Sequence, residues 1–308
     1  MKKKIIRKIW VLIASCVLTM MMAGNGSASV TGKVKLSVLC DDTAASDRFV
    51  IEHGVSIFVN LANGHHWLFD TGTTDVFLQN ADLMNISLDN LTGIAISHGH
   101  DDHTGGLTFY PRLKGNPPVY GHPYIWHKQY GIKKGKTVRI CGMPYLARKY
   151  ADPVFQPRNY VSELDEGMYF FTDVPREPGS YVPTQGKFQN EDGTGPCPII
   201  DDATIAIRTP RGIVAVFGCG HAGYVNILKA IHKKFPDDKL LSVVGGLHLK
   251  GADDEVLAKA VAYTDTVKTS DFTFYGGHCT GSNAISYFKK AYGNKVVRPL
   301  GSGCVIEF

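Results

Sequence analysis

The sequence predicts an α/β fold, and two observations support this. Short runs rich in β-branched residues alternate along the chain with amphipathic segments of helical periodicity. Hydrophobic residues make up 44% of the 308 positions, which is enough for a large buried core. The chain is therefore long enough for one large domain or two small ones.

The strands and helices are expected in alternation. Each strand segment is a short apolar run next to turn residues, and each helix segment repeats its apolar residues every three or four positions. Strands are expected over residues 33–39, 55–61, 66–69, 93–97, 203–209, 212–217, 240–244, 271–275 and 304–308. Helices are expected over residues 75–84, 105–110, 224–235, 253–269 and 282–292.

The middle of the chain, around residues 110–198, has a different composition. It is rich in Pro, Gly, Tyr and charged residues and has few clean periods, so it is expected to be an irregular insertion. Within it, residues 175–198 are interpreted as a lid or a loop on the substrate side, with a surface insertion without function as the alternative.

The N-terminus has the three parts of a secretory leader. Five basic residues at positions 2–8 precede an apolar run, 9–23, and a stretch of small residues, 24–29. We expect a signal peptide over residues 1–28, cut near Ala28, and export to the periplasm or the outside. A membrane anchor is disfavoured because the run is shorter than the ~20 residues of a span. Lipidation of Cys16 is disfavoured because the apolar run continues through Met22.

The charge and cysteine content of the exported chain exclude some functions. All of the excess charge lies in the leader, because 28 Lys and Arg and 28 Asp and Glu remain after residue 28. No basic excess indicates nucleic acid or an anionic membrane as a partner. Six cysteines also remain, which permits disulfides in an exported protein, but their spacing does not predict a pairing.

The strongest chemical signal is the sequence ISHGHDDHTGG at residues 96–106. It places His98, His100, Asp102 and His103 between an apolar strand and a Gly-rich helix start. Residues two apart in an extended segment point the same way, so His98 and His100 can share one metal ion. Asp102 and His103 follow where the chain turns and can face a neighbouring ion. Imidazole and carboxylate together suit zinc, iron or manganese.

Further ligands are available after three later strands. His221 in FGCGHAG, His248 in VVGGLHL and His278 in FYGGHCTG each lie in a Gly-containing turn at a strand end. Strand ends meet along one edge of a sheet, and glycine allows close approach of the backbone there. A single histidine after a strand is usually structural, but three beside a four-residue cluster indicate a metal centre.

These motifs carry a family resemblance. The HxHxDH spacing at residues 98–103 resembles that of the metallo-β-lactamase superfamily. Together with GCGHAGYVNIL, GGLHL and HCTG, it is similar to the dihydropterin-methyl-ribofuranosylaminobenzene-phosphate synthase-like branch of metal-dependent hydrolases. The resemblance implies a four-layer αβ/βα sandwich, formed by residues 29–308 as a single domain, with a dinuclear metal centre at one edge of the paired sheets.

The resemblance also implies a ligand set for two divalent transition-metal ions, expected to be zinc, with iron or manganese as alternatives. His98 and His100 bind one ion with a third histidine, assigned to His221. Asp102 and His103 bind the other with the last histidine, His278.

The Asp that usually bridges the two ions has no obvious counterpart in this sequence. Two alternatives follow: either a bridging hydroxide alone joins the ions, or His248 or Asp202 enters the site in place of the missing Asp. His248 is expected either to face the substrate or bind metal, or to be structural. Cys219 and Cys279 lie close to candidate ligands, but packing or disulfide roles are favoured over ligation.

The expected function is that of a metal-dependent hydrolase. A metal-bound hydroxide attacks a phosphoester or a related ester-type small molecule, and Asp102 orients the hydroxide while it binds metal. Asp102 and His248 are the expected catalytic residues. The alternative is a non-catalytic metal-binding or ligand-binding protein on the same fold.

The sequence WLFDTGTT at residues 67–74 allows a second hypothesis. Its Asp-Thr-Gly resembles half of an aspartic protease dyad, which needs two carboxylates that share one proton. No second such motif occurs, so this alternative is disfavoured. In the superfamily an Asp also lies at this strand end, and Asp70 is expected to orient the metal-binding loop.

Overall fold

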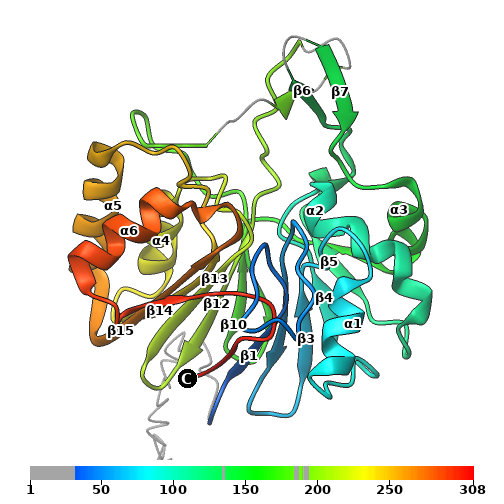
Figure 1. Cartoon of the computed structure of the whole chain (residues 1–308), viewed down its shortest axis with the longest axis horizontal. Coiled ribbons are helices and arrows are strands. Elements are labelled where there is room, and N and C mark those ends of the chain that lie inside the picture. The colour runs from blue at the N-terminus through cyan, green and yellow to red at the C-terminus, as the bar shows by residue number, and fades with distance from the viewer. Residues whose placement is uncertain (1–31, 134–135, 184–186, 189, 191–193) are drawn as a thin grey trace, which may run out of the picture.

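Two seven-stranded sheets pack face to face in the computed structural model, and helices cover the outer face of each sheet (Figure 1). The structure describes residues 32–133, 136–183, 187–188, 190 and 194–308. The arrangement confirms the expected four-layer αβ/βα sandwich. The predicted signal peptide, including Ala28 and Cys16, lies outside the described residues.

The first sheet has the strand order β17-β1-β2-β3-β4-β5-β8. Pairing from β17 to β3 is antiparallel, and pairing from β3 to β8 is parallel. Helices α1 (Val76–Leu83) and α3 (Tyr145–Ala151) lie on its outer side (Figure 1). The strands are β1 (Lys35–Cys40), β2 (Ser56–Asn60), β3 (His66–Phe69), β4 (Gly93–Ala95), β5 (Val119–Gly121), β8 (Phe155–Pro157) and β17 (Val305–Glu307).

The second sheet has the order β16-β15-β14-β13-β12-β10-β9. Its strands β13 to β16 are parallel, and β9 to β13 are antiparallel. The strands are β9 (Val161–Asp165), β10 (Met168–Phe171), β12 (Thr204–Thr209), β13 (Gly212–Phe217), β14 (Leu240–Gly246), β15 (Lys268–Gly277) and β16 (Val297–Pro299). The covering helices are α4 (Tyr224–Lys234), α5 (Asp254–Val267) and α6 (Ser282–Tyr292). No helix among the described residues is long and apolar enough to cross a membrane.

The apolar core has three parts, one at each interface between adjacent layers of the four-layer sandwich. One cluster lies between the sheets and contains Trp67, Phe69 and Ile205, each at most 1% exposed. A second packs α4, α5 and α6 on the second sheet, and a third packs α1 and α3 on the first. Because both faces of each sheet are buried, the central strands are nearly continuous apolar runs.

The structure corrects the expectation for residues 110–198. This region supplies β5 and β8 to the first sheet, β9 and β10 to the second, and helix α3. The sequence signal was weak because β5 and β8 are only three residues long, and alternation is hard to recognise over so few positions. Residues 175–183 are irregular, as expected of a loop.

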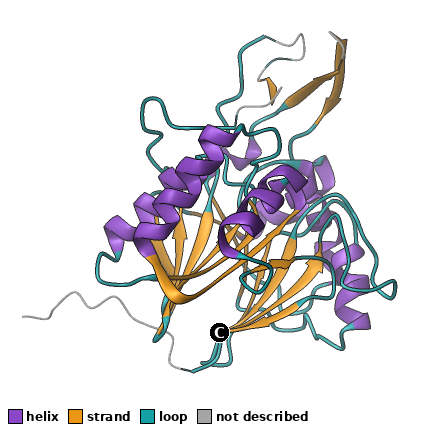
Figure 2. Ribbon diagram, turned by 60° about the vertical axis from the view of Figure 1, so that its left-hand side comes forward, coloured by secondary structure: helices purple, strands orange, loops and turns teal. Residues whose placement is uncertain are grey.

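Two local elements also differ from expectation. The helix predicted over 105–110 is a 3₁₀ helix, Gly105–Arg112, preceded by a short α2 (Asp101–Thr104). A small three-stranded sheet stands away from the sandwich (Figure 1, Figure 2). It consists of a hairpin of β6 (Tyr130–Lys133) and β7 (Lys136–Ile140), and of β11 (Lys187–Phe188), which pairs with β6.

A buried carboxylate joins the two sheets near the start of strand β3. Asp165, at the end of β9, is 6% exposed at its side chain and lies 2.8 Å from Nδ1 of His65. It also accepts a hydrogen bond of 2.7 Å from Nε1 of Trp67 on β3. Burial opposes the charge, but these hydrogen bonds to Trp67 and His65 hold the pKa of Asp165 below its usual value.

We predict that Asp165→Ala lowers the free energy of unfolding by about 1–3 kcal/mol, because it leaves the buried indole N–H of Trp67 without a partner. Because the pKa of Asp165 is lower in the folded state, its ionised carboxylate stabilises the fold at pH values above the unfolded-state pKa of about 3.9. This contribution is lost as the pH falls through the folded-state pKa. Denaturant unfolding at several pH values measures both effects. The control is Asp89→Ala, which removes a surface ion pair with Lys114. Equal losses for both variants would contradict the prediction.

Candidate metal centre

The centre forms where parallel strands of both sheets end. Strands β3 and β4 of the first sheet lead to Asp70 and to the loop that begins at Ser97. In the second sheet, Gly246 of β14 pairs with Gly277 of β15, so that His248 and His278 leave the sheet at the same level. Because the two sheets face each other, these loops meet at one edge of the sandwich (Figure 1).

The loop after β4 carries three histidines inward. His98 and His103 are fully buried and His100 is 4% exposed. The loop is fixed at Gly99, whose N–H donates to a carboxylate oxygen of Asp201 at 2.6 Å. A side chain at Gly99 would lie 2.4 Å from the carbonyl oxygen of Ile125, so only glycine allows this approach.

Asp70 fixes this loop through hydrogen bonds to its carboxylate. Its carboxylate accepts hydrogen bonds from the Ser97 N–H at 2.7 Å, the Ser97 hydroxyl at 2.6 Å and Nδ1 of His103 at 2.7 Å. Asp70 is fully buried and has a left-handed φ of 57°, a conformation that is costly outside glycine. Its partners are a serine and a histidine, not a second carboxylate, so the geometry argues against a protease dyad and supports the orienting role.

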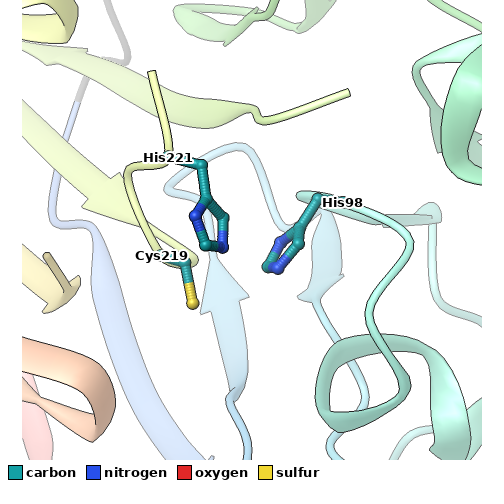
Figure 3. A group of neighbouring side chains, drawn as sticks. All are labelled: His98, Cys219 and His221. Atoms are coloured by element: carbon teal, nitrogen blue, oxygen red, sulfur yellow. The ribbon is translucent and has the colours of Figure 1, made fainter. Parts of the chain in front are cut away.

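The first group of candidate ligands joins the two sheets. Figure 3 shows the ring of His98 next to that of His221 with Cys219 beside them, and the two rings are arranged edge to face with their centroids 4.8 Å apart. Nε2 of His98 lies 2.8 Å from Nδ1 of His100. Nε2 of His221 is buried and has no hydrogen-bond partner among the described residues. Burial and the nearby imidazoles lower the pKa of His98 and of His221, which favours neutral rings with free lone pairs.

The second group lies beside the first and contains the other three predicted ligands. Oδ2 of Asp102 is 3.5 Å from Nε2 of His278 and 3.8 Å from Nε2 of His103. Burial disfavours the charge on Asp102, but the surrounding histidines lower its pKa well below the usual value. Asp70 and Asp102 raise the pKa of His103 against the opposing effect of burial.

Asp41, Asp42 and His53 surround His278, and no role was predicted for them from the sequence. Nδ1 of His278 lies 2.7 Å from Oδ1 of Asp42. The main-chain N–H of His278 donates a hydrogen bond of 3.0 Å to the carboxylate of Asp41. His53 lies 2.9 Å from Asp42 and 3.3 Å from Asp102. Despite burial, Cys279 and Asp42 raise the pKa of His278 to about 10. The Asp-Asp pair directly after strand β1 was the available signal.

His248 and Asp202 differ in their relation to the centre. His248 has a left-handed φ of 48°, and its ring centroid lies 4.5 Å from that of His221. Its ring therefore lies next to that of one candidate metal ligand. Asp202 instead accepts a hydrogen bond of 2.8 Å from the Ala222 N–H. It fixes the loop that carries His221, and burial raises its pKa to about 7.

Two thiols lie within the centre. Sγ of Cys219 is 3.3 Å from Nε2 of His103 and 3.4 Å from Sγ of Cys279. Cys279 in turn accepts a hydrogen bond from the His248 N–H at 3.2 Å. Burial raises the pKa of the Cys219 thiol. All six cysteines of the described chain are free thiols, so no disulfide uses this pair.

Comparison with known proteins agrees with this geometry. A model of the metallo-β-lactamase superfamily matches residues 51–226, which include the HxHxDH segment and His221. The chain belongs to the metallo-β-lactamase superfamily. Among solved structures, Tm1679, a metal-dependent hydrolase of the β-lactamase superfamily, has a TM-score of 0.75 and 29% identity, covering 89% of this chain and 99% of its own.

Two curated relatives come from Methanocaldococcus jannaschii. This member of the superfamily is 28% identical to 7,8-dihydropterin-6-methyl-4-(β-D-ribofuranosyl)-aminobenzene-5′-phosphate synthase over 298 residues, covering 89% of this chain and 97% of the relative. It is 31% identical to an uncharacterized protein over 258 residues, covering 82% of this chain and 92% of the relative.

The residues present fit the divalent metal ions that the superfamily fold implies. Two sets of three side chains, His98–Cys219–His221 and His103–Cys219–His278, each have ligand atoms within 4.8 Å of one another. Imidazole, carboxylate and thiolate are the ligands that transition metals prefer in proteins. Uptake of an ion beside His278 would displace a proton, so metal affinity and pH are coupled there.

We predict that Asp70→Asn weakens metal binding by about 10- to 100-fold, because the amide cannot accept hydrogen bonds from both Ser97 and His103 as the carboxylate does. Competition with a chromophoric chelator measures the dissociation constant. Asp89→Asn, on the surface, serves as the control. An affinity equal to that of the wild type, in a variant with unchanged circular dichroism, would show that Asp70 has only a structural role.

Proposed function

We propose that this protein is a metal-dependent hydrolase of phosphoesters or related ester-type small molecules. The observation that carries the proposal is the convergence of His98, His103, His221 and His278 with Asp102 at the edge between the sheets. A stable core does not need buried imidazoles, and each buried polar group costs free energy unless it is paired. Nε2 of His221, which has no hydrogen-bond partner in the part of the chain that the structure describes, therefore supports a site built for cations.

We assign His98, His100 and His221 to one ion and Asp102, His103 and His278 to the other, with zinc as the expected metal. Ions held there would lower the pKa of a water molecule and stabilise negative charge on a substrate oxygen.

The protein itself supplies orientation and proton transfer. Asp70 fixes the ring of His103, and Asp42 fixes the ring of His278, because each carboxylate accepts a hydrogen bond from Nδ1 of the ring. The side chain of Asp102 is 14% exposed, so it can orient a water molecule and still contact both histidines. His53 is 64% exposed and lies 3.3 Å from Asp102, so it can carry the proton that this water loses to solvent. His248 is proposed to face the substrate.

The name of one relative bears on the substrate class. The name of the curated synthase relative contains a ribofuranosyl 5′-phosphate, which favours phosphorylated compounds for the first assays. The N-terminal leader pattern supports export of the mature chain, and therefore a substrate that is present outside the cytosol.

We predict that the mature protein binds at least one transition-metal ion per chain and hydrolyses a member of a panel of phosphodiesters, phosphomonoesters, lactones and β-lactams. Asp102→Asn and His98→Ala should each lower kcat/KM by about 100-fold or more, because each removes a group placed at the reacting centre. Elemental analysis and steady-state kinetics measure the two quantities. His232→Ala, on helix α4 away from the centre, is the matched histidine control.

The outcomes of this experiment separate the hypotheses. Less than one bound ion per chain after reconstitution, or activity unaffected by Asp102→Asn and His98→Ala, would refute the metal-dependent hydrolase. Stoichiometric metal with no activity on the panel would favour the non-catalytic metal-binding protein. Inhibition by a carboxylate-dyad inhibitor with indifference to chelators would reopen the protease hypothesis for Asp70.

A further inference from the structure

Among the described residues, Cys219 is the one side chain shared by the candidate set that contains His98 and the candidate set that contains His103. Its sulfur belongs to the set with His98 and His221 and also to the set with His103 and His278. Cys219 follows β13 of the second sheet, whereas His98 and His103 belong to a loop of the first sheet. We propose that the thiolate of Cys219 binds both ions and bridges them.

The backbone around Cys219 is built for this close approach. Gly218 packs so tightly against the first sheet that a side chain there would lie 2.2 Å from Oγ of Ser97 and 3.0 Å from Oδ2 of Asp70. The absence of a side chain brings the next residue, Cys219, up to the histidine loop. The sulfur is therefore placed by direct contact between the loops of the two sheets.

The contact between Cys219 and His103 has the geometry of a ligand pair. Asp70 accepts the hydrogen on Nδ1 of His103, which leaves Nε2 to face the sulfur at 3.3 Å. Sulfur and nitrogen ligands on one tetrahedral zinc ion, at about 2.3 and 2.0–2.1 Å from the metal, lie about 3.6 Å apart. The two atoms are therefore already close to the separation that a shared ion requires.

Cys279 is the competing candidate, and its contacts assign it a different role. Its sulfur lies 3.4 Å from Sγ of Cys219 and accepts the His248 N–H at 3.2 Å. Its sulfur therefore contacts the sulfur of Cys219 and can position it, as groups around a ligand atom commonly do. Of the two thiols, only Cys219 belongs to the sets that contain His98 and His103.

The proposal rests on the proposed metal-dependent function, and spectroscopy of the Co(II)-loaded, reduced protein tests it without reference to activity. We predict a thiolate-to-Co(II) charge-transfer band in the near ultraviolet for the wild type. The band should persist in Cys279→Ser and in the matched control Cys304→Ser, near the C-terminus. It should vanish in Cys219→Ser, together with a loss of at least about tenfold in affinity for both ions.

Sharing of the sulfur has its own signature. Two Co(II) ions joined by one thiolate are magnetically coupled, so the electron paramagnetic resonance signal at two equivalents should be weaker than twice the signal at one. Cys219→Asp supplies another side chain that can bridge, so it should restore binding of both ions and the coupling without the charge-transfer band.

The possible failures are distinguishable. If the wild type binds Co(II) with ligand-field bands but no charge-transfer band, the thiolate proposal is wrong and the metal site stands. If the band disappears in Cys279→Ser and not in Cys219→Ser, the assignment to Cys219 is wrong. Two additive, uncoupled signals would refute bridging. If no Co(II) binds at all, the proposed function fails first. Should Cys219→Ser not fold, the wild-type, Cys219→Asp and Cys279→Ser spectra still decide.

Discussion

The buried carboxylate of Asp70 is the contact on which the centre depends. It joins the end of β3 to the loop after β4 through three hydrogen bonds, and Gly218 of the opposite sheet packs against it. A buried anion is costly unless its oxygens are fully paired, so the surrounding loops have little freedom to move. The same hydrogen bonds that satisfy the carboxylate also set the rotation of the His103 ring.

The region around this contact accumulates backbone strain. Asp70, His248 and His278 all have left-handed φ values, at 57°, 48° and 43°. Such conformations persist only where the surrounding structure determines them, and they are common at functional sites. Here each is held by side-chain or main-chain contacts within the centre, and the large apolar cores of the two sheets supply the stability that offsets the strain.

Much of this arrangement is predictable from the sequence, and the reasons for the rest are physical. His98, His100, Asp102 and His103 are close in sequence, and His221 and His278 are marked by strand ends with glycine, so the structure brings together the residues expected. Their roles as ligands stay predictions.

The carboxylates that hold these residues are not predictable in the same way. Asp42 meets His278 across 236 positions, and Asp201 meets Gly99 across 102. Pairing at such separations depends on how the sheets stack and leaves no local pattern. The short strands β5 and β8 were missed because three residues carry too little periodicity.

The division of the candidate ligands between the two sheets has a consequence for biogenesis. His98 and His103 are made early in synthesis, whereas Cys219, His221 and His278 come from the last third of the chain and from the other sheet. A nascent or partly folded chain therefore has at most a loop with a few weakly placed donors. High-affinity uptake must wait until the sheets have docked, and from then on bound ions favour the docked state by mass action.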